Sequence, residues 1–129
     1  MMKKAEDCLV LVVEDDKQSR DFLVTVIKKF GFQHIDVDSG MAALEEIKSV
    51  TPDLFLIDGL MPNMDGFELI GRIREISQFA ETPIIMTTAL DDAKHIKESI
   101  AKGANAYVVK PINVLRLKGK IQELMPYES

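Results

Sequence analysis

Four apolar runs in the sequence are each followed directly by side chains that can take part in chemistry. These side chains are Glu14 and Asp15, Asp58, Thr88 and Lys110. Carboxylates that lie close together raise each other's pKa unless a cation neutralises them, and Mg²⁺ prefers such oxygen ligands. A carboxylate can accept a phosphoryl group as an aspartyl phosphate, and a nearby lysine can neutralise a phosphoryl oxygen. If they converge, these side chains predict Mg²⁺-dependent phosphoryl transfer to an aspartate.

The apolar runs themselves have the length and composition of buried β-strands. Continuous runs of apolar, largely β-branched residues are typical of strands whose two faces are both covered in a parallel sheet. Such runs lie at residues 9–13, 54–57, 84–87 and 106–109, and a weaker alternating run at 35–37 is typical of an edge strand.

Helical patterns separate the strands, with apolar residues recurring at a spacing of three or four. Asp16 is placed to cap the start of the first helix, and Asp65 with Glu68 has the form of a capping box for the third. Gly31 and Gly103 are placed to end the first and fourth helices. The predicted apolar stripes run over residues 22–30, 41–50, 67–76, 93–100 and 114–124.

Strands that alternate with helices form βαβ units with right-handed crossovers. The sequence therefore predicts an α/β fold of the doubly wound (βα)5 kind, built on a five-stranded parallel sheet. In such sheets the functional crevice lies beyond the carboxyl ends of the strands. The chemically useful side chains all follow strands, so we expect them to meet in that crevice.

The length and charge of the chain limit its organisation and its partners. Its 129 residues suit one compact domain, which we predict over residues 8–125 with short tails at 1–7 and 126–129. The net charge of −5 argues against direct binding of nucleic acid, which favours a basic surface. The apolar run that begins at Cys8 is too short for a signal peptide or a membrane span, and a lone cysteine suits a reducing compartment. We therefore expect a cytoplasmic protein with no membrane partner.

Together the motifs resemble the receiver domain of two-component response regulators, of the chemotaxis-regulator type. The resemblance covers nearly the whole chain, from about residue 9 to residue 124. It implies a flavodoxin-like fold with the strand order 2-1-3-4-5. The matching segments are 10–15 (VLVVED), 52–58 (PDLFLID), 61–66 (MPNMDG), 88–89 (TA) and 107–111 (YVVKP).

The resemblance implies a role for each residue around a bound Mg²⁺. Asp58 is similar to the family's phosphoacceptor, and it would also contact the metal. Asp15 would bind the ion directly, Glu14 would hold one of its waters, and Leu60 would offer its backbone carbonyl. Lys110 would neutralise a phosphoryl oxygen.

The resemblance also implies a conformational switch. Thr88 would move its hydroxyl onto the new phosphoryl group, and Tyr107 would turn inward into the space that is vacated. A phosphoryl group carries up to two negative charges and strong acceptor oxygens, so it can drive such a rearrangement. The bond between Lys110 and Pro111 resembles the family's cis peptide bond.

The implied partners follow from the same resemblance. A histidine kinase or a phosphotransfer protein would donate the phosphoryl group, and a downstream protein target or a fused output domain would respond. A phosphorylation-dependent dimer is a further implication. The protein would be a signalling switch that catalyses its own phosphorylation and dephosphorylation, and not an enzyme that releases a product.

The individual residues have alternative interpretations. Asp58 could cap a turn, the pair at 14–15 could lie in a solvated turn, and Lys110 could be a surface lysine. Successive strand residues point to opposite faces, so only one of Thr87 and Thr88 can face the crevice, and the alanine that follows favours Thr88.

Two other functions compete with the switch. A receiver that no longer uses phosphorylation could serve as a constitutive interaction module, although such a module has no chemical reason to keep the whole set of polar residues. A phosphatase with an aspartate nucleophile would place a second aspartate two residues after the first. Leu60 occupies that position here, which argues against turnover of outside phosphoesters.

Overall fold

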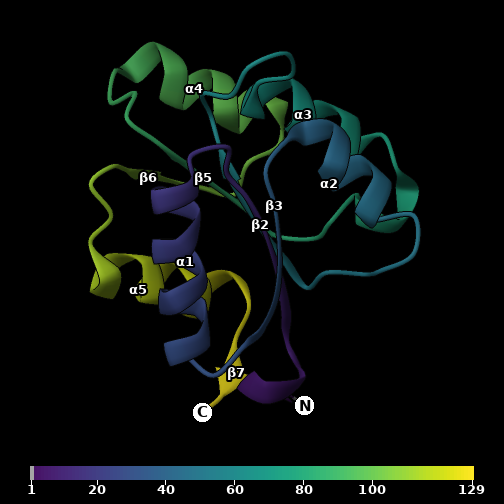
Figure 1. Ribbon diagram of the computed structural model, residues 1–129, viewed down its shortest axis with the longest axis vertical. Helices are drawn as coiled ribbons and strands as arrows, with labels where there is room; N and C mark the ends of the chain where they lie inside the picture. Colours follow the sequence, from purple (N-terminus) through teal and green to yellow (C-terminus); the bar gives the residue numbers. More distant parts are fainter. Residues whose placement is uncertain (1) are drawn as a thin grey trace.

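The computed structural model describes residues 2–129, and a five-stranded parallel sheet forms its centre (Figure 1). The strand order is β3-β2-β4-β5-β6, which is the predicted order 2-1-3-4-5 counted over these five strands. The predicted α/β fold is therefore confirmed. The strands are β2 (Leu9–Val13), β3 (Gln33–Val37), β4 (Leu54–Asp58), β5 (Ile84–Thr88) and β6 (Ala106–Val109).

Helices cover both faces of the sheet and enclose two apolar cores (Figure 1). Helices α1 (Lys17–Lys29) and α5 (Val114–Leu124) cover one face. Helices α2 (Gly40–Glu46), α3 (Gly66–Arg74) and α4 (Ala93–Lys102) cover the other. Within residues 2–129, no helix combines the length and the apolar character needed to cross a membrane.

The predicted helix ends are largely confirmed. The side chain of Asp16 accepts a hydrogen bond from the backbone N–H of Ser19, and that of Asp65 accepts one from Glu68. Gly31 and Gly103 follow α1 and α4 with φ angles of 92° and 119°, a left-handed conformation that glycine adopts at low cost.

The second helix differs from its predicted stripe. It ends at Glu46, and Met41 is 62% exposed instead of facing the core. Gly40 and Ala43 are the buried residues within the helix. Met64 packs so closely against Gly40 that a Cβ atom there would lie 2.8 Å from its sulfur. The buried side of α2 therefore combines Gly40 and Ala43 with Leu44 and, at its C-terminal end, Ile47 of the predicted stripe, whereas Met41 lies outside it.

The two terminal segments, predicted as short tails, pair with each other at the amino ends of the sheet strands (Figure 1). Strand β1 (Lys3–Lys4) runs parallel to β7 (Tyr127–Glu128), and one 3-10 turn (Ala5–Asp7) leads into β2. A second 3-10 turn (Ser77–Phe79) precedes β5. The ring of Tyr127 packs edge-on against Phe32 at a centroid distance of 4.6 Å. This contact joins the C-terminus to the core beneath α1.

Candidate functional site

The strand register places the chemically useful residues level with one another. Strand β2 pairs with β4 as far as Val13 and Ile57, and β5 pairs with β6 as far as Thr88 and Val109. The next residue along each strand therefore emerges at the carboxyl edge of the sheet. Asp58, Glu14 and Lys110 meet there.

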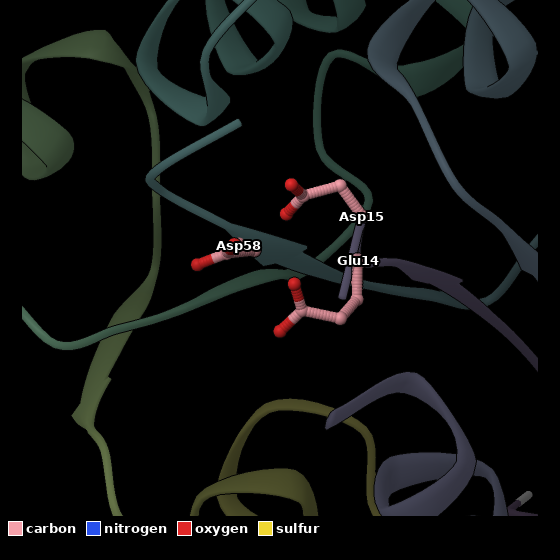
Figure 2. A group of neighbouring side chains, drawn as sticks. All are labelled: Glu14, Asp15 and Asp58. Carbon is pink, nitrogen blue, oxygen red and sulfur yellow. The ribbon is translucent and has the colours of Figure 1, made fainter. Parts of the chain in front are cut away.

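Three carboxylates form the centre of the site (Figure 2). Oxygen atoms of Glu14, Asp15 and Asp58 lie within 4.8 Å of one another. Glu14 is fully buried and Asp58 is 4% exposed, whereas Asp15 is exposed. Two buried acids beside each other are costly unless a cation accompanies them.

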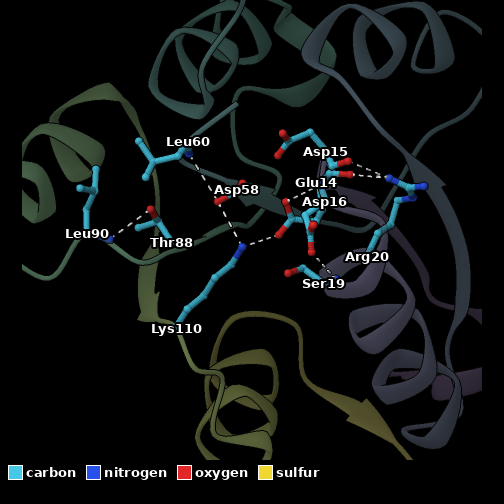
Figure 3. Close-up of polar contacts among 10 residues, drawn as sticks. All are labelled: Glu14, Asp15, Asp16, Ser19, Arg20, Asp58, Leu60, Thr88, Leu90 and Lys110. Carbon is cyan, nitrogen blue, oxygen red and sulfur yellow. Dashed lines mark hydrogen bonds and ion pairs between the residues drawn. The ribbon is translucent and has the colours of Figure 1, made fainter. Parts of the chain in front are cut away.

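Lys110 is the cation that accompanies the two buried acids (Figure 3). Its ammonium group binds the Glu14 carboxylate and lies 3.5 Å from Oδ1 of Asp58. Burial and the neighbouring Glu14 raise the pKa of Asp58 from 3.8 to about 7, while Lys110 acts in the opposite direction. One lysine therefore offsets the negative charge only in part, and the site still favours a further positive charge.

Thr88 and Tyr107 both bind the backbone of Leu90. The N–H of Leu90 donates to the hydroxyl of Thr88 over 3.3 Å (Figure 3), and the hydroxyl of Tyr107 donates to the carbonyl of Leu90. Tyr107 is 8% exposed, so its ring already lies inside the protein. Gly59 leaves room for Thr88, because a Cβ there would lie 3.1 Å from the Thr88 hydroxyl. Leu90 thus connects Thr88, beside the crevice, to Tyr107 on β6, next to α4.

The other predicted residues lie at the rim of the carboxylate cluster. The backbone N–H of Leu60 donates to Oδ1 of Asp58 over 3.4 Å, and the Leu60 side chain is 50% exposed. The peptide bond between Lys110 and Pro111 is cis. Thr87 lies on the opposite face of β5 from Thr88, and within residues 2–129 its buried hydroxyl has no hydrogen-bond partner. Of the two threonines, Thr88 is therefore the one beside the crevice.

Sequence reasoning missed one side chain of the site, that of Arg20, and the backbone contacts of one further residue, Leu90. Arg20, on α1, donates to the backbone carbonyls of Glu14 and Asp15. Leu90 takes part only through its backbone, so its side-chain type carries no signal of the contact. A single arginine on a charged helix likewise carries no signal of its partners, because they lie on a loop and on a neighbouring strand.

Removing the Asp58 charge is expected to stabilise the metal-free protein above pH 7. The raised pKa means that the folded state binds more protons than the unfolded state between about pH 4 and pH 7, so stability falls as the pH rises through this window. Asp58→Asn avoids that loss and should raise the free energy of unfolding by roughly 1–3 kcal/mol at pH 8, with little effect at pH 4.

Urea unfolding in EDTA at both pH values measures this difference. Asp21→Asn, which alters an exposed carboxylate on α1, is the control and should show no comparable pH dependence. Equal effects of Asp58→Asn at pH 4 and pH 8 would contradict the proposed burial cost.

Comparisons with known proteins agree with this architecture. Residues 10–122 match the model of the response regulator receiver domain. The chain is 32% identical over 117 residues to hybrid signal transduction histidine kinase D from Dictyostelium discoideum, which covers 91% of this chain and 8% of that protein. It is 28% identical over 116 residues to the phosphate regulon transcriptional regulatory protein PhoB from Escherichia coli, which covers 90% of this chain and 51% of that protein.

Solved structures give the same result. The chemotaxis protein CheY4 from Vibrio cholerae superimposes with a TM-score of 0.86 at 30% identity, covering 91% of this chain and 98% of that one. The chain spans a small part of the kinase and about half of the transcriptional regulator, so it corresponds to one module of those longer relatives. It belongs to the response regulator receiver domain family of two-component signal transduction, and it has that family's flavodoxin-like fold.

Proposed function

We propose that Asp58 accepts a phosphoryl group from a phosphohistidine of a histidine kinase or a phosphotransfer protein. The observation that carries the proposal is a buried Asp58 carboxylate with two further carboxylates and one lysine around it. An oxygen of Asp58 attacks the phosphorus atom in line with the bond to the histidine nitrogen. The new O–P bond forms as the N–P bond breaks, and the electron pair of that bond stays on the imidazole.

Mg²⁺ is the cofactor that fits this site. All three side chains of the cluster offer carboxylate oxygens, the donor chemistry that this hard cation prefers. The raised pKa of Asp58 comes first from burial and then from the neighbouring Glu14, so a bound cation would favour the charged carboxylate that both of these disfavour. Asp15 and Asp58 would hold the ion with the backbone carbonyl of Leu60, and Glu14 would hold one of its waters. When bound, Mg²⁺ supplies neutralising charge at the phosphoryl oxygens.

The remaining residues position and stabilise the phosphoryl group. Lys110 already reaches Oδ1 of Asp58, so it can neutralise an oxygen of the transferred group. The hydroxyl of Thr88 leaves the N–H of Leu90 and donates to a second phosphoryl oxygen. Because positioning and electrostatics dominate phosphoryl transfer, these residues let the domain catalyse its own phosphorylation and its later hydrolysis.

The output of the switch is a changed protein-binding face. Loss of the bond from Leu90 to Thr88 also releases the residue that holds the Tyr107 hydroxyl. Tyr107 lies on β6, next to α4, so the surface around these elements responds to phosphorylation. A downstream protein, a fused output domain or a second phosphorylated copy would recognise this surface.

The phosphoryl donor is proposed to dock on the side of Lys110 that faces α1, away from Thr88 and Tyr107. A pocket of about 670 Å³ opens there between α1 and the loop after β6, with Lys110 in its wall. Phe22 and Pro111 line the pocket, and Phe22 is 44% exposed. This apolar surface suits the side of a helix that presents a phosphohistidine towards Asp58.

The proposed function is tested by phosphorylation with acetyl phosphate. Intact-mass measurement should show one added phosphoryl group that requires Mg²⁺ and is lost in Asp58→Asn. Asp53→Asn is the matched control, since Asp53 binds Lys3 and the backbone of Leu9 at the other end of the sheet. Labelling that persists in Asp58→Asn would assign the acceptor to another residue. No labelling by acetyl phosphate, by beryllofluoride or by a phosphorylated histidine donor would refute the proposal.

A further inference from the structure

Arg20 connects the acidic loop of the site, where Figure 3 shows its contacts, to the edge strand β3 of the sheet. Its Nη1 donates to the backbone carbonyl of Glu14 over 2.9 Å and lies 3.4 Å from that of Asp15. Its Nε lies 3.4 Å from a carboxylate oxygen of Asp36 on β3. The arginine side chain is 17% exposed, so these contacts are largely shielded from water.

The loop that Arg20 binds carries two of the three carboxylates of the cluster. Its start is fixed by the N–H of Glu14, which donates to Val37 on β3, and its end by the Asp16 cap of α1. Between these points the guanidinium group binds the peptide carbonyls on which the directions of the Glu14 and Asp15 side chains depend. A planar fork of donors suits this task, because it fixes direction as well as distance.

We infer that Arg20 is a positioning residue for the metal site, holding the backbone of Glu14 and Asp15 so that their carboxylates converge with Asp58. Asp36 orients the guanidinium group from the edge strand. The inference rests on the proposed function, because it assigns Arg20 to the Mg²⁺ that the carboxylates would hold. Removal of a residue that orients metal ligands without touching the metal typically weakens metal binding by about 10- to 100-fold.

The sign of the effect separates positioning from simple charge. Arg20 is positive and lies against the acidic loop, so as a charge alone it repels a cation. Its removal would then tighten Mg²⁺ binding. As a positioning residue it has the opposite effect, because its removal frees the loop and spreads the carboxylates. Weaker Mg²⁺ binding in Arg20→Met is therefore evidence for positioning, because the loss of a repelling charge would make binding tighter.

The test is an NMR titration of the ¹⁵N-labelled chain with MgCl₂, which follows the backbone amides of Glu14 and Gly59. Arg20→Met should raise the Mg²⁺ dissociation constant about 10-fold. Arg20→Lys should fall between this variant and the wild type, because it keeps the charge but loses the fork. Arg72→Met removes an arginine that pairs with Glu68 on the surface of α3, and it should bind Mg²⁺ like the wild type.

A second measurement separates metal positioning from other roles. At saturating Mg²⁺, phosphorylation of Arg20→Met by acetyl phosphate should return to within about threefold of the wild-type rate, since only binding of the ion is impaired. Rates that stay far below the wild-type rate would place Arg20 in another step and overturn the inference.

The remaining outcomes are equally decisive. Unchanged or tighter Mg²⁺ binding in Arg20→Met would overturn the inference and leave the proposed function intact. If Arg20→Met does not give a folded amide spectrum, the single variant Asp36→Asn replaces it. The inference would then be overturned if Arg20→Lys and Asp36→Asn, measured separately, both bind Mg²⁺ with the wild-type affinity. A wild-type chain whose amides do not respond to Mg²⁺ would refute the metal site itself.

Discussion

Replacing Arg74 with methionine is expected to lower the free energy of unfolding by about 3 kcal/mol, although the residue is remote from the crevice. Its guanidinium group donates to the backbone carbonyls of Gly103, Phe79 and Thr82 and to the side-chain oxygen of Asn105, over 2.6–3.1 Å. These acceptors belong to the segments before β5 and after α4. Methionine fills similar space but donates nothing, so partly buried acceptors lose their partners at once.

Urea unfolding followed by circular dichroism measures this loss. Arg72→Met is the matched control, because Arg72 is two residues away, is exposed and pairs only with Glu68 among the ion pairs of residues 2–129. It should change stability by less than about 0.5 kcal/mol. Arg74→Lys should recover only a part of the loss, since one ammonium group cannot replace the fork. A change below about 1 kcal/mol in Arg74→Met would show that water replaces the arginine without cost.

The order of elements was predictable because it depends on patterns that local chemistry sets. Short runs of apolar, β-branched residues favour strands that are covered on both faces, and the right-handed crossover then limits how they are joined. The caps at Asp16 and Asp65 were equally readable, since a short polar side chain before an apolar stripe has few other uses. The convergence of Glu14, Asp15 and Asp58 follows from these same rules.

The outward faces of the helices were not predictable from spacing. Met41 and Ile100 belong to apolar stripes, yet they are 62% and 49% exposed. The stripe gives the period of a helix but not its rotation against the sheet, which depends on close contacts such as that of Gly40 with Met64.

The long-range polar contacts were also beyond the sequence. Arg20 binds backbone carbonyls of the loop just before its own helix, and Arg74 binds that of Gly103, beyond α4, and a carbonyl acceptor leaves no trace in the residue type. The same holds for Leu90, whose peptide group joins Thr88 to Tyr107. The sequence names the side chains that do chemistry, but it does not identify the backbone groups that orient them.

Replacing Lys110 with glutamine is expected to have opposite effects on phosphorylation and on metal binding. Lys110 neutralises Glu14 and Asp58 in the metal-free protein, so it competes with Mg²⁺ for the same carboxylates. Without it the pKa of Asp58 rises further, and the uncompensated site should bind Mg²⁺ several-fold more tightly above pH 8. The phosphoryl oxygen, however, loses its cationic partner, and the rate of phosphorylation should fall about 100- to 1000-fold.

The opposite signs make this prediction sharper than a loss of activity alone. A variant that merely disturbed the fold would weaken Mg²⁺ binding and slow phosphorylation together, whereas removal of a competing cation separates the two. The Mg²⁺ titration and the acetyl phosphate reaction at saturating Mg²⁺ measure them independently, with the exposed Lys102→Gln as the control for loss of one positive charge. Weaker metal binding in Lys110→Gln would mean that the lysine organises the carboxylates instead of competing with the ion. A phosphorylation rate within tenfold of the wild type would mean that Mg²⁺ and Thr88 suffice to neutralise the transferred group.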